Sequence, residues 1–172
     1  MINILENIKE KYKICFVGNG HDKTSLFVRI ISNNYSKNSG GICFGIKSFE
    51  LKNGKKVELQ LWDIAGQEKY RELSKTKIKN SDYIVIVFDI TKKETFDDVK
   101  KCWYPIVKKI LKTNLIYLIW NKIDLYEQEE VDPEEAENFV IENNLRYFAT
   151  FCKTGKGIDK FLLDLKNEII KI

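Results

Sequence analysis

The stretch from Gly18 to Thr24, written GNGHDKT, combines residue types that bind phosphate groups. The usual phosphate-binding loop has the pattern G-x-x-x-x-G-K-[S/T], and its backbone N–H groups converge on the phosphates at the start of a helix. In that pattern the lysine adds positive charge at the β- and γ-phosphates, and the next hydroxyl binds Mg²⁺. Lys23 and Thr24 supply both groups here, so the stretch predicts a site for nucleotide phosphates.

This loop departs from the usual pattern at two points. Asp22 stands where a glycine normally precedes the lysine, and the spacing from Gly18 to Lys23 is one residue too short. Aspartate tolerates left-handed backbone angles better than most residues, but a carboxylate at this place is expected to repel a phosphate. Taken alone, the stretch fits an ordinary strand–helix turn with a capping aspartate equally well. The other residues expected at the phosphates are Asn19, Gly20, His21 and Ser25.

A second polar stretch, WDIAGQEKY over 62–70, follows a predicted strand. A polar turn explains any one of its residues, but it does not explain the whole run at this position. With this motif the chain resembles the Ras superfamily of small GTPases, and the Rab branch most closely. The resemblance implies that Asp63 holds Mg²⁺ through water and that Gly66 senses the γ-phosphate through its amide. It also implies that Gln67 is the catalytic residue and orients the attacking water.

The third stretch, NKIDL, comes directly after the apolar run LIYLIW. A carboxylate here can accept two hydrogen bonds from the N1–H and N2–H₂ groups of guanine, which adenine does not offer. The pattern N-K-x-D is weak alone, but it is strong after a fifth strand and downstream of the second motif. The resemblance implies that Asp124 binds the base, with Leu125 beside it. It also implies that Asn121 ties the loops together and that Lys122 lays its stem on the base.

The resemblance places further residues at the base. Tyr35, twelve residues after Lys23, matches an aromatic that stacks on the base, and an ordinary loop aromatic is the alternative. The stretch YFATFCKTG occupies the place of the family's E-T-S-A-K loop, where Lys153 is kept and Phe151 and Cys152 replace serine and alanine. The backbone amide of Cys152 can still donate to guanine O6, because that contact needs no particular side chain.

A serine is expected in place of a metal-binding threonine. The stretch SGGICF aligns with the Rab-like T-I-G-x-D-F, and this alignment puts Ser39 beside Mg²⁺ and the γ-phosphate. Serine carries the same hydroxyl, so Thr24, Ser39 and Asp63 are the expected metal ligands. Only four positions separate Tyr35 from Ser39, where the family usually has seven, so this loop is expected to close over the nucleotide differently.

Segments typical of strands and helices alternate along the chain and place these loops. Short apolar runs predict buried strands, and apolar residues at helical spacing predict helices. The strands are expected at 12–17, 42–51, 55–64, 83–90, 114–120 and 145–152, and the helices at 23–34, 95–112, 131–144 and 157–172. A further helix-like segment contains Arg71.

Local signals refine these elements. Asn53 and Gly54 predict a hairpin between the second and third strands, with positive φ at both central turn residues. Pro105 must bend or restart its helix, and Asp132 and Pro133 are typical of an N-cap and a first helical residue. The pattern predicts an α/β fold with a mainly parallel six-stranded sheet, helices on both faces and ligands at the carboxyl ends of the strands. The resemblance implies the small G-protein form of the P-loop NTPase fold.

Composition fits one globular domain. The chain has 172 residues, of which 44% are hydrophobic, and we expect one G domain over 1–172 with a short N-terminal extension over 1–10. The net charge of the chain is only +4, and its lysines are spread along the sequence beside acidic residues. No nucleic-acid partner is therefore predicted. No apolar run approaches the roughly 18–20 residues of a membrane span.

Four scattered cysteines without a CxxC pair indicate reduced, buried thiols and a cytoplasmic protein.

Several hypotheses follow for the function. The first is a switch that binds GTP and GDP with Mg²⁺, hydrolyses GTP slowly and meets protein regulators and effectors through its switch regions, in a Rab-like role at endomembranes in vesicle trafficking. The second is a pseudo-GTPase that binds no nucleotide, or does not hydrolyse it, and acts as a protein-interaction scaffold. A P-loop kinase or ATPase lacks support because the NKxD motif is intact.

Three stretches depart from ordinary Rab sequences. KIKNS replaces the aromatic-rich Y-Y-R-G-A segment, so we expect regulator and effector recognition to differ. CWYPIV is more similar to the Rho branch, although the Rho-type helical insert is missing. The sequence ends at EIIKI without a terminal cysteine for prenylation, so we expect a removed tail, a following domain or another kind of anchoring.

Overall fold

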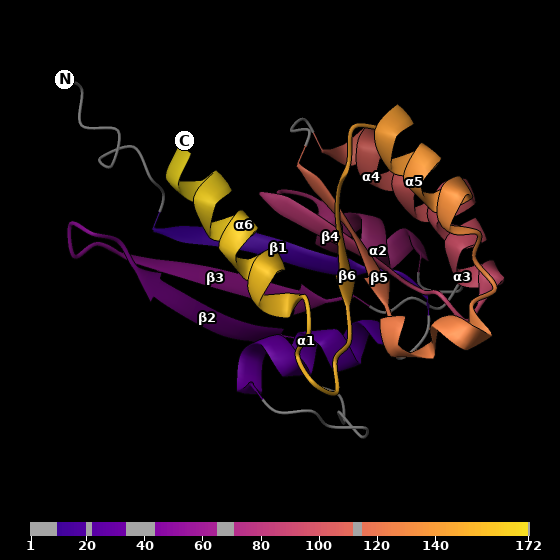
Figure 1. The fold of residues 1–172 in the computed structure, drawn as a ribbon. Coiled ribbons are helices and arrows are strands. Elements are labelled where there is room, and N and C mark those ends of the chain that lie inside the picture. The colour runs from indigo at the N-terminus through magenta and orange to yellow at the C-terminus, as the bar shows by residue number, and fades with distance from the viewer. Residues whose placement is uncertain (1–9, 20–21, 34–43, 65–70, 112–114, 172) are drawn as a thin grey trace.

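A mainly parallel sheet of six strands runs through the structure, a computed structural model that describes residues 10–19, 22–33, 44–64, 71–111 and 115–171 (Figure 1). The strands are β1 (Lys11–Val17), β2 (Phe44–Glu50), β3 (Lys56–Asp63), β4 (Tyr83–Asp89), β5 (Ile116–Asn121) and β6 (Arg146–Thr150). They follow the order β2-β3-β1-β4-β5-β6, and only β2 and β3 pair antiparallel among them. The predicted sheet is therefore confirmed.

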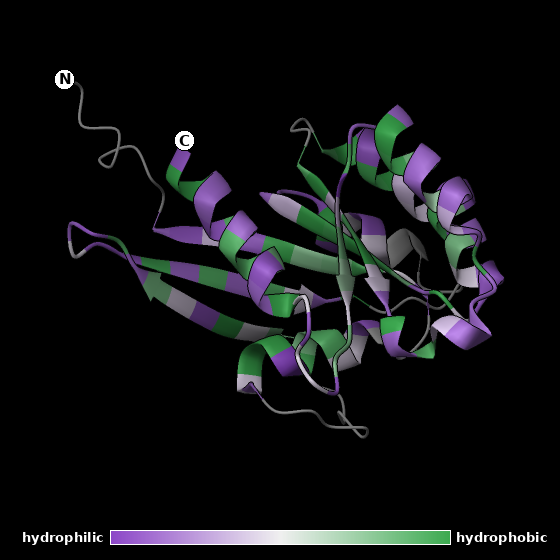
Figure 2. Ribbon diagram, viewed as in Figure 1, coloured by the Kyte–Doolittle hydropathy of each residue, from purple (hydrophilic) through white to green (hydrophobic). Residues whose placement is uncertain are grey.

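Helices cover both faces of this sheet, as the sequence predicts. One face carries α1 (Asp22–Ser32) and α6 (Ile158–Lys171), and the other carries α2 (Arg71–Ile78), α3 (Lys93–Asp98), α4 (Tyr104–Ile110) and α5 (Pro133–Glu142). Every residue of β4 and β5 is buried, because helices pack against both sides of these central strands. Figure 2 shows the hydrophobic residues concentrated along the strands, with hydrophilic residues on the outer sides of the helices.

The predicted hairpin is present, but its turn differs from the expected type. Gly54 takes a positive φ of +79°, whereas Asn53 does not. The Gly54 N–H donates to the carbonyl of Leu51 at 2.9 Å, and the Asn53 side chain accepts from the Lys55 N–H at 3.1 Å. The connection is therefore a longer hairpin loop that ends with a left-handed glycine, and the prediction of positive φ at both central residues is wrong.

Two prolines mark where helices begin. The helix predicted over 95–112 consists of α3, a π-helical segment over Val99–Trp103 and α4, and the residues at both junctions keep right-handed helical backbone angles. Pro105 lies in the first turn of α4 and has no N–H, and the Tyr104 N–H just before it donates to Val99 in the wider π pattern. Pro133 opens α5, where Asp132 caps the helix by accepting from the Glu134 N–H at 3.0 Å. Both predicted signals are confirmed.

The described cysteines and helices add two observations. Cys15, Cys102 and Cys152 form no disulfide in the described part of the chain, and the first and last of them are buried. No helix in the described ranges is long and apolar enough to cross a lipid bilayer.

Candidate functional site

The carboxyl ends of the parallel strands bring the predicted motif loops to one edge of the sheet (Figure 1). In the register of the sheet, Phe16 near the end of β1 lies beside Asp63 at the end of β3. At the end of β5, Asn121 lies between Asp89 of β4 and Thr150 of β6. The loops that carry the three motifs therefore start next to one another, as expected for an open α/β sheet.

Gly18 starts the first loop in a conformation that only glycine allows. Its φ is +136°, and a Cβ at this position would lie 2.1 Å from the backbone oxygen of Val87 in β4. Any side chain here would collide with the backbone of the neighbouring strand. The loop therefore leaves β1 pressed closely against β4 before it turns into α1, which begins at Asp22.

Lys23, Thr24 and Asp63 meet at the start of α1. The Lys23 ammonium forms an ion pair with Asp63 Oδ1, and both residues are buried, with 3% and 9% of their surfaces exposed. The Thr24 hydroxyl donates to Asp63 Oδ2 at 2.6 Å. A hydroxyl and a carboxylate are the hard oxygen donors that Mg²⁺ prefers. Two of the three predicted metal ligands are thus brought together, and their donor atoms fit this ion.

A contact that the sequence did not predict fixes Asn19 in the same loop. The Asn19 side-chain amide donates to the carboxylate of Asp98, and its oxygen accepts from the indole Nε1 of Trp103 at 3.1 Å. Trp103 is fully buried in the π-helical segment. The shortened loop is therefore tied to the helix beside it. The sequence holds the signal only as the CWYPIV stretch, whose tryptophan could not be paired with Asn19 without the fold.

Residues of the third motif line a cavity of about 210 Å³ at the strand ends. Asp124 and Lys122 come from the loop after β5, and Cys152 comes from the loop after β6. In the described part of the chain, the carboxylate of Asp124 has no hydrogen-bond or ion-pair partner. All the described residues that line it were predicted at the nucleotide: Ser25, Asn121, Lys122, Asp124, Leu125, Phe151, Cys152 and Lys153.

Asn121 connects two of the loops that form this cavity. Its side-chain oxygen accepts from the Thr150 hydroxyl at 3.2 Å and from the Cys152 thiol at 3.2 Å. The Asn121 side chain is buried, so these bonds form away from bulk water. These two bonds join the end of β5 to the end of β6 and the loop after it, and the role that the resemblance implies for Asn121 at a nucleotide stays a prediction.

Asp89 is a site residue that the sequence analysis missed. It is fully buried at the end of β4 and accepts from Lys122 Nζ at 2.6 Å. Its other oxygen accepts from the amide and the hydroxyl of Thr91 at 3.0 and 2.8 Å. Burial alone would raise the pKa of Asp89, but the bonds and charge of Lys122 and the bonds of Thr91 outweigh it and hold the pKa below its ordinary value. Asp89 therefore stays ionised and fixes the head of Lys122 while the stem lines the cavity.

The backbone conformation of Lys122 is also unusual. Its φ of +67° and ψ of +36° place it in the left-handed region, which is uncommon for a residue with a side chain. The Leu125 N–H donates to the Lys122 carbonyl at 2.9 Å and closes the following turn. The strained residue is thus held by a turn on one side and by Asp89 on the other.

Some predicted site residues lie outside the described residues. The catalytic prediction for Gln67, the phosphate contact of Gly66 and the aromatic contact of Tyr35 fall there, and so does the metal ligand Ser39. Gly20 and His21 of the first loop also fall there. Their roles remain predictions.

Comparisons with known proteins agree with this geometry. The model of the Ras family matches residues 13–171. The Ras-related protein Rab-1 of Theileria parva is 34% identical over 154 residues, which cover 87% of this chain and 70% of that protein. Rab-12 of Mus musculus is 33% identical over 167 residues, covering 94% and 68% of the two chains. Rab-30 of Homo sapiens is 33% identical over 171 residues, covering 96% and 83%. The chain therefore belongs to the Ras family and is a Rab-like small GTPase.

Proposed function

We propose that this chain is a guanine-nucleotide switch that binds GTP and GDP with Mg²⁺, hydrolyses GTP slowly and has a Rab-like role in vesicle trafficking. One observation carries the proposal: α1, the end of β5 and the loops after β5 and β6 line one cavity, and all of its described lining residues belong to the expected nucleotide site. This cavity lies at the same edge of the sheet as the Lys23–Thr24–Asp63 cluster. A base and its phosphates could therefore be held by one continuous set of loops.

The phosphate end of the site would work through charge and backbone donors. Lys23 is a buried cation at this end, and its ammonium would shift from Asp63 toward the β- and γ-phosphates. Thr24 and Asp63, with Ser39 as the third expected ligand, would hold Mg²⁺, which neutralises charge on the phosphate oxygens when bound. Asn19, fixed by Trp103, would keep the shortened loop in place against these groups.

The base end of the site would select guanine. Asp124 supplies a carboxylate at the cavity that can accept both the N1–H and the N2–H₂ of the base. Lys122 and Phe151 line the same cavity and offer an aliphatic stem and an aromatic ring for packing against it. Adenine presents no pair of donors to this carboxylate, so the site would discriminate by leaving Asp124 unpaired.

Hydrolysis and switching would depend on the loops around the γ-phosphate. Gln67 would orient the attacking water, and Gly66 would sense the γ-phosphate through its amide. Order in these loops would then differ between the GTP and GDP states and would be recognised by protein regulators and effectors. We place the protein in the cytoplasm, at the surface of endomembranes.

The nucleotide that the purified protein carries tests this function. Freshly purified chain is denatured, and the released small molecules are identified by chromatography and mass spectrometry. We expect GDP or GTP, because a tightly held nucleotide survives purification. A protein that releases no nucleotide and also fails to bind GDP in a titration with Mg²⁺ would establish the scaffold alternative. Release of ADP or ATP would instead move the chain to an adenine-nucleotide function.

Replacing Trp103 with phenylalanine should speed GDP release. The change keeps an aromatic ring in the core but removes the Nε1–H that donates to Asn19. Losing one such bond corresponds to a release rate about 2- to 10-fold higher. The rate is measured by displacing a fluorescent GDP with excess GDP in stopped flow.

Trp120 offers a matched control, since it is also buried and its Nε1 has no hydrogen-bond partner among the described residues. Trp120→Phe should lower the thermal midpoint of unfolding to a similar extent and leave the release rate unchanged. Equal release rates in Trp103→Phe and the parent chain would show that the bond to Asn19 does not hold the loop.

A further inference from the structure

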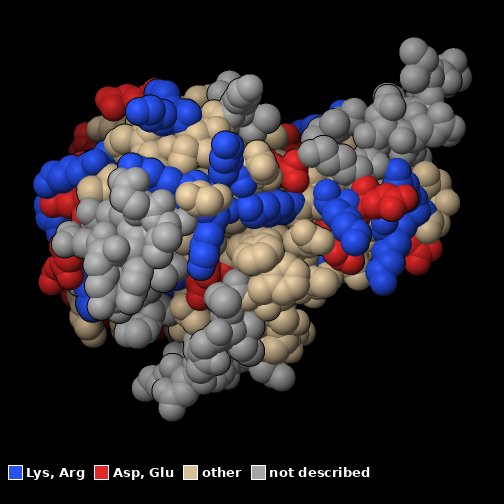
Figure 3. Space-filling view, turned by 180° about the vertical axis from the view of Figure 1, so that it is seen from behind, with Lys and Arg blue, Asp and Glu red and all other residues tan. Residues whose placement is uncertain are grey.

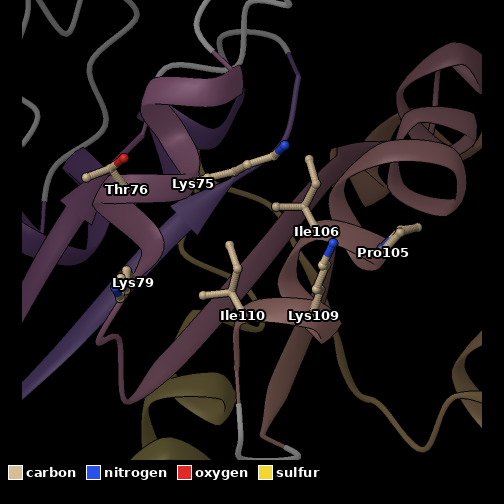
Figure 4. A pocket seen from close by; sticks show the side chains of 7 residues that line it. All are labelled: Lys75, Thr76, Lys79, Pro105, Ile106, Lys109 and Ile110. Carbon is tan, nitrogen blue, oxygen red and sulfur yellow. The ribbon is translucent and has the colours of Figure 1, made fainter.

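A groove on the second face of the sheet is separate from the nucleotide site. It lies between α2 and α4 and encloses about 720 Å³ (Figure 4). Lys75 and Thr76 of α2 and Lys79 just after it form one wall, and the other wall and the floor come from α4. Among the described residues, none that lines this groove also lines the base cavity. The groove is therefore a second hollow, distinct from the base cavity in its described lining.

The walls of the groove are basic. Lys75 and Lys79 lie on the α2 side and Lys109 on the α4 side, and no acidic residue is among the described residues that line it. Figure 3 shows lysine and arginine side chains gathered around uncharged surface on the face turned away from the viewer in Figure 1. Positive charge thus flanks the groove on both sides.

Several neighbouring lysines are already engaged by other groups. On the same face, Lys93 and Lys100 form ion pairs with Glu135. Lys13 Nζ donates to the Lys79 carbonyl at 3.0 Å. Its positive charge therefore lies at the C-terminal end of α2, where the helix dipole is negative. By contrast, Lys79 and Lys109 have no ion-pair partner within the described ranges. Their charge is available to a ligand in the groove.

The floor of the groove is aliphatic. Ile106 and Ile110 are half-buried and pack at the edge of the core cluster on this face, and Pro105 beside them is exposed. Apolar surface that is rimmed by charged side chains and open to solvent is typical of a protein interaction site. Burying these side chains under a partner would remove apolar area from water without moving the core.

We propose that this groove binds an acidic amphipathic helix of a partner protein, whose apolar side chains enter between α2 and α4 and whose carboxylates meet Lys75, Lys79 and Lys109. A helix with apolar anchors on one side can place those side chains in a hollow between two helices. Carboxylates on both edges of such a helix complement positive charge on both walls. A lipid bilayer presents a flat surface and cannot fill the hollow, and a nucleic acid would leave the aliphatic floor uncovered.

Selection from a random peptide library tests this proposal. The library is displayed on phage and selected against the purified chain, and the enriched peptides are synthesised and titrated by fluorescence anisotropy. We expect peptides with apolar residues at i, i+3 or i+4 and i+7 and with acidic residues beside them. The triple variant K75E/K79E/K109E should weaken their binding at least about tenfold. Thr76→Trp, which keeps every charge but fills the groove, should also weaken it.

A second triple variant controls for net charge. K52E/K156E/K160E changes the total charge by the same amount at exposed lysines outside the groove and should leave peptide binding unchanged. Circular dichroism and thermal unfolding verify that each variant is folded. The proposal is overturned if the enriched peptides lack acidic residues, if both triple variants weaken binding equally, or if Thr76→Trp has no effect. It is also overturned if K75E/K79E/K109E reduces binding to vesicles of phosphatidylserine and phosphatidylcholine but leaves peptide binding intact, because the groove would then serve a membrane.

Discussion

Replacing Asp124 with asparagine is expected to weaken GDP binding at least roughly a hundredfold and to favour xanthosine diphosphate instead. The carboxylate can accept from both N1–H and N2–H₂ of guanine, whereas an asparagine offers one acceptor and one donor. Xanthine carries an oxygen where guanine carries the N2 amine, so the amide donor of asparagine finds a partner in xanthine alone. With guanine, the same donor would face another donor and leave both unpaired.

The structure indicates that this substitution changes recognition and not the fold. Asp124 is exposed at the rim of the base cavity, and its carboxylate has no partner in the described part of the chain. The turn that carries it is closed by the backbone bond from Leu125 to Lys122. Removing the charge therefore breaks no contact on which the described loop depends, and the thermal midpoint of the nucleotide-free protein should stay close to that of the parent chain.

Parallel titrations with fluorescent GDP and fluorescent xanthosine diphosphate measure the change in nucleotide preference. Asp159→Asn is the matched control, because this exposed aspartate at the start of α6 does not line the base cavity. It should bind GDP like the parent chain. If Asp124→Asn also binds GDP like the parent chain, Asp124 does not bind the base.

The sequence predicts the sheet and the loops well because their signals are local. The continuous apolar runs of β4 and β5 can only be buried on both faces, and the structure buries every residue of both strands. The NKxD motif comes directly after such a strand, so its place at the edge of the sheet follows from strand direction alone. The residues that line the base cavity in the described part of the chain were consequently all predicted.

Contacts between distant segments could not be predicted in this way. Asn19 and Trp103 are separated by 84 positions, and their contact depends on the fold placing the π-helical segment beside the first loop. Nothing in the sequence distinguishes Asp89 from an ordinary residue at the end of a strand. Its role becomes visible only in the fold, where Lys122 donates to its carboxylate. The groove between α2 and α4 likewise needs both helices in position. A short motif specifies what its own residues can bind, but it does not specify which buried neighbours hold those residues in place.

Replacing Lys23 with methionine is expected to cost both stability and nucleotide binding, for two separable reasons. Methionine has a similar length but no charge, so the buried carboxylate of Asp63 would lose its counter-ion. Removing one partner of a buried ion pair typically lowers the free energy of unfolding by about 3–5 kcal/mol. The same change removes the cation that the phosphates need, and GDP binding should weaken at least roughly a hundredfold.

An exposed ion pair shows how much of this stability loss depends on burial. Lys93 Nζ lies 2.8 Å from Glu135 Oε2, but the two side chains are 50% and 35% exposed. Water already solvates these charges, so Lys93→Met should change the free energy of unfolding by only about 0.2–1 kcal/mol. Urea unfolding of the nucleotide-free proteins measures both values under the same conditions. A loss for Lys23→Met as small as that for Lys93→Met would show that Asp63 does not depend on Lys23 in the folded chain.

The double variant Lys23→Met/Asp63→Asn separates the structural role of Lys23 from its role in binding. Asparagine at position 63 carries no charge to be left unpaired, and its side-chain oxygen can still accept from the Thr24 hydroxyl, which now donates to Asp63 at 2.6 Å. Most of the lost stability should therefore return. GDP binding should not return, because neither the phosphate cation nor the carboxylate on the metal side is restored. A double variant that regains both stability and GDP affinity would mean that Lys23 serves only to neutralise Asp63, and the phosphates would then have to be held by the backbone of the loop alone.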